Sequence, residues 1–393
     1  MVDIEIRAAR PEDIDDVARI IGDRIGEEDA REAEIVLRDP DFDKKRWFVA
    51  VAGEHVLSTA AVFPGQLRFG DVTVGAGAIE FVATREGAEG RGLVRQLLDE
   101  IHRTASARGE MVQWIVGITY FYRRFGYEYA LPVDGMHLFS AGEAPDMPTG
   151  WSVRPADADD IAAIAAAQES LARAADVSLT TNEFMWDIYR RSPSYEVVIA
   201  RGPGGYGFGR VYSWEDDRYL TDVVAHSSAG AAALVNAASE SGGHELSVMS
   251  RPGARPYLDE LAPWTPSHDA YYVRVADPVA LLEALRPELS RRLNAAKEDL
   301  EGDALISLYG SSIRFTYGDQ RVGPMRREGG VPGPISEGGS GVAPDLIVSL
   351  MLGPLGAAGL AERHPDVNLG EQAELMQVLF PPQTCDVHTW VVP

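Results

Sequence analysis

Residues 79–94 read Ile79-Glu-Phe-Val-Ala-Thr-Arg-Glu-Gly-Ala-Glu-Gly-Arg-Gly-Leu-Val94, and this stretch decides the fold of the N-terminal part of the chain. A β-branched and aromatic run leads into a glycine-punctuated loop. An amphipathic pattern then continues to Ile101, so a strand, a turn and a helix follow one another. Gly90 and Gly92 allow the backbone to approach a ligand closely, and the unpaired N–H groups at the start of the helix point toward it. We therefore predict an anion-binding loop at the N-terminus of this helix.

The composition excludes several classes of protein. The chain has 393 residues, enough for two or three domains, with 36 basic and 60 acidic residues and a net charge of −24. This charge argues against nucleic acid or an anionic membrane as a partner, and it weakly favours cationic ligands. We expect a soluble, cytoplasmic protein, because no apolar run has the length of a membrane span and the N-terminus lacks a signal pattern. The single cysteine excludes an internal disulfide, and the eight scattered histidines predict no metal site.

The residues around the opening stretch predict an α/β (mixed α+β) domain. Pro11 and the acids that follow it mark the start of the first helix. Consecutive strands before the glycine loop predict an antiparallel meander. The helix after the loop is followed by another strand, so strands and helices are mixed along the chain. We expect strands at 4–6, 47–51, 55–63, 72–84 and 111–118, and helices at 14–21 and 93–108.

A second copy of this pattern begins near residue 150. A shift of 147 residues places Arg7, Asp13, Ile14 and Val17 on Arg154, Asp160, Ile161 and Ile164. In both copies a strand that ends in Arg is followed by a capped helix of the same length. Residues 138–150, rich in Gly and Pro, are predicted to be the linker between the copies. The second copy reads Val224-Ala-His-Ser-Ser-Ala-Gly-Ala-Ala-Ala233 where the first has its paired glycines. We therefore predict that the second copy does not bind the same anion.

The pattern changes again at Asp277 and predicts a third unit of helices and short strands. Residues 329–341 are rich in Gly, Pro and Ser and are predicted to be flexible. The tail 380–393 is predicted to be extended and packed, because it ends on Trp390, Val391 and Val392. Helices are expected at 278–294, 344–352 and 369–379, and strands at 304–308, 312–316 and 322–326.

Two motifs resemble those of the GNAT superfamily of acyltransferases. Glu89-Gly-Arg-Gly-Leu-Val94 is similar to its pyrophosphate loop, Arg/Gln-x-x-Gly-x-Gly/Ala, and Tyr120-Phe-Tyr-Arg-Arg-Phe-Gly-Tyr127 is similar to its segment at the reactive end of the cofactor. Glu89 departs from the loop's usual Arg or Gln, and Val94 from its Gly or Ala. A carboxylate at position 89 would repel a pyrophosphate unless it points to solvent, and Arg91 and Arg95 are expected to compensate for it.

By its repeat and length, the whole chain resembles the narrower Eis (enhanced intracellular survival) family. That resemblance implies an acetyl-CoA-binding GNAT domain at 1–149, a degenerate GNAT domain at 150–276 and a sterol-carrier-protein-like α+β domain at 277–393. It implies direct N-acetyl transfer from acetyl-CoA to a primary amine of a cationic small molecule or peptide. It also implies a homo-oligomer, namely a hexamer.

The resemblance also assigns a cofactor site. The backbone of residues 82–84 would pair with the pantetheine arm, the loop would hold the pyrophosphate, and two residues at the end of the next strand would flank the thioester. These cofactor-binding residues are Val82, Ala83, Thr84, Gly90, Arg91, Gly92, Leu93, Val94, Arg95, Gly117 and Ile118.

For catalysis, the resemblance makes Tyr122 the general acid that protonates the departing thiolate, a role that suits a phenol at neutral pH. The alternative is that Tyr122 is one more packed aromatic residue in a cluster that is expected to be mostly core, namely Tyr120, Phe121, Phe125, Tyr127 and Tyr129. The amine needs a base, which the resemblance assigns to the C-terminal carboxylate of Pro393. Glu80 is the alternative base, acting through a water, because strand alternation predicts that it shares a face with Val82 and Thr84.

Other interpretations stay open. Glu27, Glu28 and Asp29 fall in a helical connection that, in such folds, lies over the acceptor pocket, where they would attract a cation or form a solvated face. Cys385 has no motif partner and is predicted to be a small buried hydrophobic residue. A second hypothesis for the chain is a non-catalytic protein whose third domain binds a lipid-like ligand and whose glycine loop is inactive.

Overall fold

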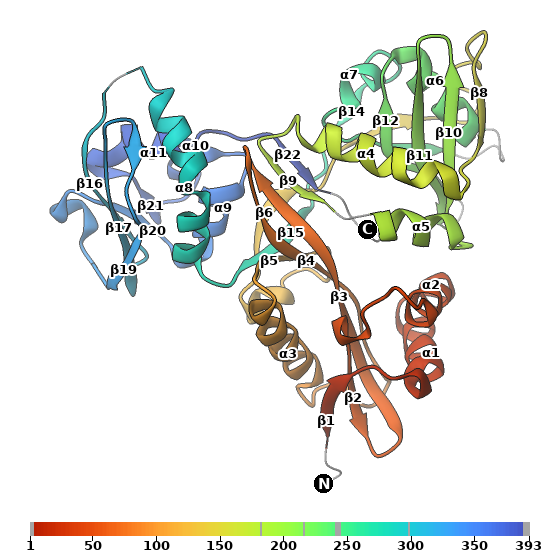
Figure 1. The fold of residues 1–393 in the computed structure, drawn as a ribbon, viewed down its shortest axis with the longest axis horizontal. Coiled ribbons are helices and arrows are strands. Elements are labelled where there is room, and N and C mark those ends of the chain that lie inside the picture. Colours follow the sequence, from red (N-terminus) through yellow and green to blue (C-terminus); the bar gives the residue numbers. More distant parts are fainter. Residues whose placement is uncertain (1–3, 181–182, 215–216, 240–244, 298, 388–393) are drawn as a thin grey trace.

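Three β-sheets with flanking helices make up the protein (Figure 1). The computed structural model describes residues 4–180, 183–214, 217–239, 245–297 and 299–387. The architecture is mixed α/β, as predicted. Short 3₁₀ helices lie at η1 (Pro11–Asp13), η2 (Lys44–Arg46), η3 (Tyr122–Phe125), η4 (Ala158–Asp160), η5 (Pro334–Glu337), η6 (Pro344–Leu346) and η7 (Gly370–Gln372).

The first sheet carries the opening stretch. Neighbouring strands along its main path are antiparallel except for β4 and β5, which are parallel. Helix α3 (Leu93–Ala107) lies on one face, and helices α1 (Ile14–Arg24) and α2 (Glu27–Arg38) lie on the other (Figure 1). The strand order is β1 (Glu5–Ala8), β2 (Trp47–Ala52), β3 (His55–Phe69), β4 (Val72–Thr84), β5 (Glu110–Ile115), β15 (Ala270–Val275) and β6 (Glu128–Pro132).

The second sheet repeats the pairing pattern of the first. Its first four strands are antiparallel, its fourth and fifth are parallel, and its sixth is antiparallel to the fifth. The strand order is β8 (Ser152–Pro155), β10 (Glu196–Gly202), β11 (Gly205–Trp214), β12 (Asp217–Ala225), β13 (Leu246–Met249), β7 (Met136–Phe139) and β14 (Trp264–Thr265). The helices of this part are α4 (Ile161–Ala172), α5 (Glu183–Arg191), α6 (Ser228–Ser239) and α7 (Arg255–Leu258).

Side-chain contacts repeat along with the strands. Arg7 Nη1 donates to Asp13 Oδ2 at 2.6 Å, and Arg154 Nη1 donates to Asp160 Oδ2 at the same distance. Each carboxylate also accepts from a backbone N–H three residues earlier, which fixes the start of the following helix. These are the two pairs that the 147-residue shift superimposed.

The two sheets exchange a strand. β7 precedes the predicted boundary at residue 149 but lies in the second sheet, and β15 follows the second-sheet strands along the chain but lies in the first. The prediction that residues 138–150 form a linker is therefore wrong at its start. Leu138 is paired with Ser247 of β13, a partner far away in sequence that no local pattern indicates.

The third sheet corrects another prediction. Residues 329–341 were expected to be flexible, but β20 is fully buried and is paired with β16 and β21. Its glycine neighbour serves close packing, since a Cβ at Gly339 would lie 2.6 Å from the Leu305 side chain. The strands are β16 (Gly302–Ser307), β17 (Ser311–Gly318), β18 (Arg321–Val322), β19 (Arg326–Gly329), β20 (Ser340–Val342) and β21 (Val367–Asn368). The helices are α8 (Pro278–Asn294), α9 (Ile347–Leu352), α10 (Gly356–Arg363) and α11 (Ala373–Leu379).

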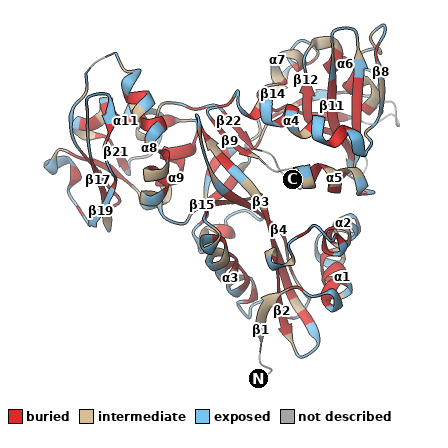
Figure 2. Cartoon of the chain, in the orientation of Figure 1, coloured by how far each residue is buried: buried red, intermediate tan, exposed pale blue. Residues whose placement is uncertain are grey.

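Two short strands join the parts at the far end of β3. β9 (Val177–Thr180) pairs with residues 66–69 of β3, and β22 (Cys385–Val387) pairs with β9. All three residues of β22 are buried, which agrees with the prediction that the tail is packed. Residues Trp390 to Pro393, on which that prediction was based, lie outside the described residues. Figure 2 shows buried residues along the strands of all three sheets. No described helix is long and apolar enough to cross a membrane.

Candidate active site

The glycine loop has a left-handed backbone conformation at both of its central glycines. Gly90 and Gly92 both have a φ of +74°, a left-handed conformation that is strained for any residue with a side chain. Gly92 directly precedes α3. A Cβ at either position would meet nothing within 4 Å, so glycine is needed for its φ and not for space. The first N–H groups of α3, which have no partner within the helix, therefore lie at a pocket.

This pocket, the α3 pocket, has a volume of about 400 Å³. It contains most of the residues that were predicted to bind a cofactor. Arg91 and Gly117 are both exposed, and neither lines it. The lining is Arg24, Val82, Ala83, Thr84, Ala88, Glu89, Gly90, Gly92, Leu93, Val94, Arg95, Ile118, Phe121, Tyr122, Arg124 and Phe125.

One wall of the α3 pocket is a strand edge. The pairing of β4 with β5 ends at Ala78 and Trp114, whereas β4 stays paired with β3 as far as Thr84. Among the described strands, residues 82–84 thus have a partner on one side only. Their other edge can pair with an extended ligand in the manner of an added strand.

Tyr122 lines the α3 pocket. The residue is 4% exposed, and a Cβ at Gly117 would approach its Cε2 to 2.3 Å, so the glycine makes room for the ring. Burial raises the pKa of the Tyr122 phenol above its usual range, and the nearby Glu80 raises it further. The hydroxyl therefore keeps its proton at neutral pH and can donate it.

The aromatic neighbours of Tyr122 are only partly the core that was predicted. Tyr127 is fully buried and its hydroxyl lies 2.9 Å from His102 Nε2. Tyr120 and Tyr129 are 65% and 38% exposed, so the prediction that they belong to the core is wrong. Tyr120 lies in the loop between β5 and η3, and Tyr129 Oη accepts a hydrogen bond from the Tyr120 backbone N–H, a placement that the sequence does not indicate.

Glu89 is paired with a residue that sequence reasoning missed. Its carboxylate lies 3.2 Å from Arg24 Nη2 at the end of α1, and both side chains are roughly half exposed. Arg24 is 65 positions away in sequence, so no motif indicated it. The predicted compensating residue Arg95 instead stacks over the Phe125 ring, 4.9 Å from its centroid. The pair offsets the negative charge within the pocket.

Glu80 does not share a face with Val82, contrary to prediction. Phe81 has a φ of +53°, and Phe81 and Val82 both lie opposite Ala60, which makes a β-bulge. The bulge interrupts the alternation, so Phe81 packs with the α1 and α2 side while Val82 packs against the α3 side. The acids that act on Glu80 are Glu32 and Asp29 of α2.

These three acids form a cluster between α2 and β4. Glu32 is 1% exposed, and burial raises its pKa to about 8 despite the opposing effect of Arg210. Burial, together with Glu32 and Asp29, raises the pKa of Glu80 well above its usual range. Burial also raises the pKa of Asp29. Glu32 therefore holds a proton at neutral pH, which a cation bound beside it would displace.

Replacing Glu32 with Gln should make stability less dependent on pH. In the unfolded chain a Glu loses its proton near pH 4.5, whereas folded Glu32 keeps it to about pH 8. The folded state thus binds the extra proton within this window. Rising pH should then cost about 1.4 kcal/mol of unfolding free energy per pH unit from this residue. Gln mimics the protonated acid, so urea unfolding between pH 5.5 and 7.5 should show a flatter slope for Glu32→Gln. Equal slopes would contradict a raised pKa.

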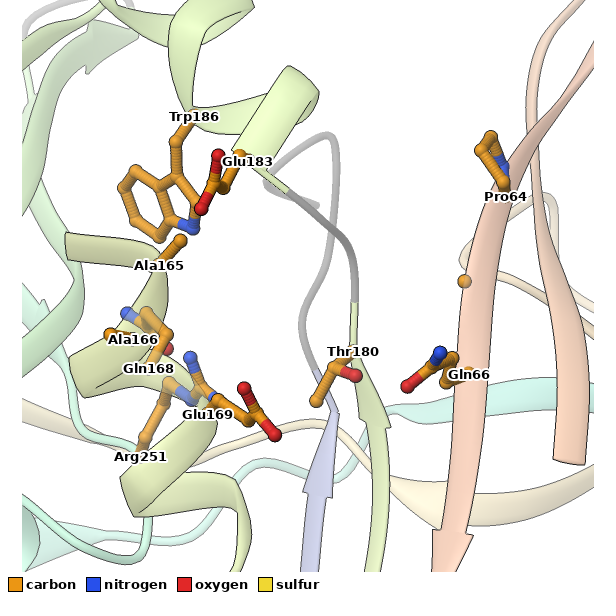
Figure 3. A pocket seen from close by; sticks show the side chains of 11 residues that line it. Pro64, Gln66, Ala165, Ala166, Gln168, Glu169, Thr180, Glu183, Trp186 and Arg251 are labelled. Atoms are coloured by element: carbon orange, nitrogen blue, oxygen red, sulfur yellow. The ribbon is translucent and has the colours of Figure 1, made fainter. Parts of the chain in front are cut away.

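A second cavity lies between the first and second sheets. It has a volume of about 500 Å³ and shares no lining residue with the α3 pocket. Figure 3 shows α4 side chains and Arg251 facing Pro64 and Gln66 of β3, with Thr180 between them. Arg251 Nη1 and Gln168 Oε1 are buried there without a hydrogen-bond partner. No sequence pattern indicates this cavity, because its walls come from separate parts of the chain.

Neither a reactive cysteine nor a metal-ligand cluster is found among the described residues. Cys385 is buried, as predicted, and its Sγ lies 3.5 Å from Leu352 O. Burial raises the pKa of its thiol to about 12, so the thiol stays neutral and is a poor nucleophile. In the described parts of the chain, no three His, Cys, Asp or Glu residues gather as metal ligands would.

Comparison with known proteins gives a family for the first part of the chain. Residues 5–130 match the family model of the acetyltransferase (GNAT) domain. No curated protein sequence matches the chain significantly.

Solved structures resemble the chain over its full length. The GCN5-related N-acetyltransferase from Kribbella flavida is 18% identical with a TM-score of 0.67, over 99% of this chain and 100% of that one. A probable N-acyltransferase from Enterococcus faecalis V583 is 13% identical with a TM-score of 0.72, over 99% and 100%. Eis1 from Mycobacterium abscessus is 17% identical with a TM-score of 0.64, over 98% and 99%. Residues 5–130 are therefore a GNAT acetyltransferase domain, and the whole chain has the fold of Eis1 and of other GCN5-related N-acetyltransferases.

Proposed function

We propose that the protein is an acetyl-CoA-dependent N-acetyltransferase that transfers acetyl directly to a primary amine. The observation that carries the proposal is that the N-terminus of α3, the Tyr122 side chain and the strand edge at residues 82–84 line one pocket. Acetyl-CoA supplies the activated acyl group when it is bound. The first N–H groups of α3 suit its pyrophosphate, and residues 82–84 suit its amide-bearing pantetheine arm.

Tyr122 is the proposed general acid. Its hydroxyl keeps its proton at neutral pH and its side chain lines the α3 pocket, beside Gly117 and Ile118, which are proposed to flank the thioester. Donation of that proton to the departing sulfur lowers the cost of breaking the C–S bond.

The proposed acceptor is a cationic amine that approaches from the α2 side. Asp29, Glu32 and Glu80 gather there, and an ammonium group beside them would favour their charged forms. Glu80 would then be able to take the ammonium proton, directly or through a water. The carboxylate of Pro393 stays the other candidate base, and it lies outside the described residues.

The second and third parts are proposed to be a degenerate GNAT domain and a sterol-carrier-protein-like domain, within a homo-oligomer, namely a hexamer. The second part shares the strand order of the first. Its helix α6, however, begins at Ser228, three residues after β12 ends at Ala225, which leaves no loop comparable to residues 85–92. Acetyl-CoA is therefore expected to bind only at α3.

Titration with acetyl-CoA tests the cofactor site directly. At one hundred times its Kd, acetyl-CoA should raise the unfolding free energy by about 2.7 kcal/mol. Glu89→Gln should tighten acetyl-CoA binding by roughly twofold to fivefold. The substitution removes a negative charge from the pocket and frees Arg24 from its ion pair, and charge interactions at exposed sites are worth up to about 1 kcal/mol.

Glu86→Gln is the matched control, since Glu86 is an exposed acid of the same loop outside the pocket lining. Its Kd should equal that of the wild type. Absence of any stabilisation of the wild type by acetyl-CoA would refute the proposal.

A further inference from the structure

Two tyrosine hydroxyls hold the loop between β5 and η3. Tyr272 Oη donates to Ile118 O at 3.2 Å, and Tyr129 Oη accepts from the backbone N–H of Tyr120 at 3.0 Å. The two hydroxyls lie 2.5 Å apart, and their rings stack with centroids 4.2 Å apart. Both polar backbone groups are thus tied to one tyrosine pair.

The direction of these hydrogen bonds is fixed by their ends. A backbone N–H can only donate and a carbonyl can only accept. Since the single proton of Tyr272 goes to Ile118 O, the proton of Tyr129 must go to Tyr272 Oη. The order is therefore Tyr120 N–H to Tyr129, Tyr129 to Tyr272, and Tyr272 to Ile118 O.

Apart from these bonds, the loop has one turn hydrogen bond, from the Phe121 N–H to Ile118 O at 3.1 Å. Ile118 and Tyr120 are 70% and 65% exposed, so their side chains contribute little packing. Tyr120 also has a φ of +67°, a conformation that costs a side-chain-bearing residue free energy and persists only where the surroundings hold it. The hydroxyl pair provides that hold.

The same pair supports the general acid. The ring centroids of Tyr272 and Tyr122 lie 5.6 Å apart, and a Cβ at Gly117, inside the loop, would lie 2.3 Å from Tyr122 Cε2, so the loop backbone passes close to the Tyr122 ring. Tyr272 is fully buried in β15, between β5 and β6. A shift of the loop would therefore move both Ile118 and Tyr122 relative to a substrate.

We propose that Tyr272 and Tyr129 are positioning residues for acetyl transfer, which orient the loop 116–121 and the Tyr122 phenol without touching the reacting atoms. This inference rests on the proposed function. It also gives the strand exchange a role, because β15 follows the second-sheet strands in the chain and carries Tyr272 back to the first sheet.

Phe substitutions remove only the hydroxyls and keep the rings. Tyr272→Phe should lower kcat roughly 10- to 100-fold, the size of effect that a small misplacement causes. Tyr129→Phe should have a smaller effect, because Tyr272 can still donate to Ile118 O. The double variant should resemble Tyr272→Phe alone, since the bonds act as one chain. The Kd for CoA should not change, because the glycine loop is untouched.

Tyr212→Phe is the matched control, a buried tyrosine of the second sheet that stacks on Tyr219. It should leave kcat unchanged. Hydrogen exchange measured on the full-length protein should show faster exchange of residues 116–121 in Tyr272→Phe and wild-type exchange in Tyr212→Phe.

The outcomes separate the two proposals. If the wild type transfers no acetyl group but exchange in 116–121 rises in Tyr272→Phe, the proposed function fails and the loop support stands. If the wild type is active and Tyr272→Phe matches it in both kcat and exchange, the positioning role is overturned. Unchanged kcat with faster exchange would also overturn it, because the loop would then be irrelevant to transfer.

Discussion

Tyr122→Phe should lower kcat by roughly 10² to 10⁴, the usual contribution of a general acid, and should leave the Kd for acetyl-CoA unchanged. The substitution keeps the ring that packs on Phe121, with centroids 5.1 Å apart, and removes only the donor. Without this donor, CoA must leave as an unprotonated thiolate. The site disfavours such a charge, because the burial that raises the pKa of Tyr122 also disfavours other anions there. Release of the free thiol in steady state, measured beside equilibrium binding, separates the two effects.

Tyr127→Phe is the control for this experiment. Tyr127 is fully buried, its ring centroid lies 6.0 Å from that of Tyr122, and its hydroxyl bonds to His102 away from the pocket lining. We expect a small loss of stability and little change in kcat. Equal losses in the two variants would assign Tyr122 to packing.

Asp386→Ala should lower the unfolding free energy by about 3–5 kcal/mol, the cost of leaving a buried charge without its partner. Arg251 is 3% exposed, and its Nε and Nη2 donate to the two Asp386 oxygens at 2.7 and 2.5 Å. Asp386 lies in β22, which pairs with β9, and β9 in turn pairs with β3 of the first sheet. Urea unfolding measures the loss.

The double variant Arg251→Met and Asp386→Leu is the control for the ion pair. It removes both charges and keeps apolar volume, so it should recover much of the stability that Asp386→Ala loses. A single variant as stable as the wild type would show that the pair is not desolvated as its burial implies.

Local features of the fold could be predicted from the sequence. The glycine loop and α3 follow from residues within one short stretch, and the Arg7–Asp13 pair recurs at Arg154–Asp160 because each is made within seven positions. Such contacts depend on chain geometry over a few residues, which sequence patterns record directly.

Features that depend on distant partners could not be predicted. β15 carries Tyr272 to a site whose other residues precede position 130, and the family model also ends there. The bulge at Phe81 reversed the expected side of Glu80, and a Gly- and Ser-rich segment became the buried strand β20. In each case tertiary packing, and not local propensity, decides the outcome.

Acetyl transfer itself tests the central claim most directly. The full-length protein should be mixed with acetyl-CoA and a panel of polyamines, aminoglycosides and lysine peptides, and the products followed by mass spectrometry together with thiol release. The α3 pocket and Tyr122 predict an amine heavier by one acetyl group, formed in step with free CoA and lost in Tyr122→Phe. Acetyl-CoA that binds but yields no acetylated amine with any member of the panel, or a product rate unaffected by Tyr122→Phe, would contradict the account.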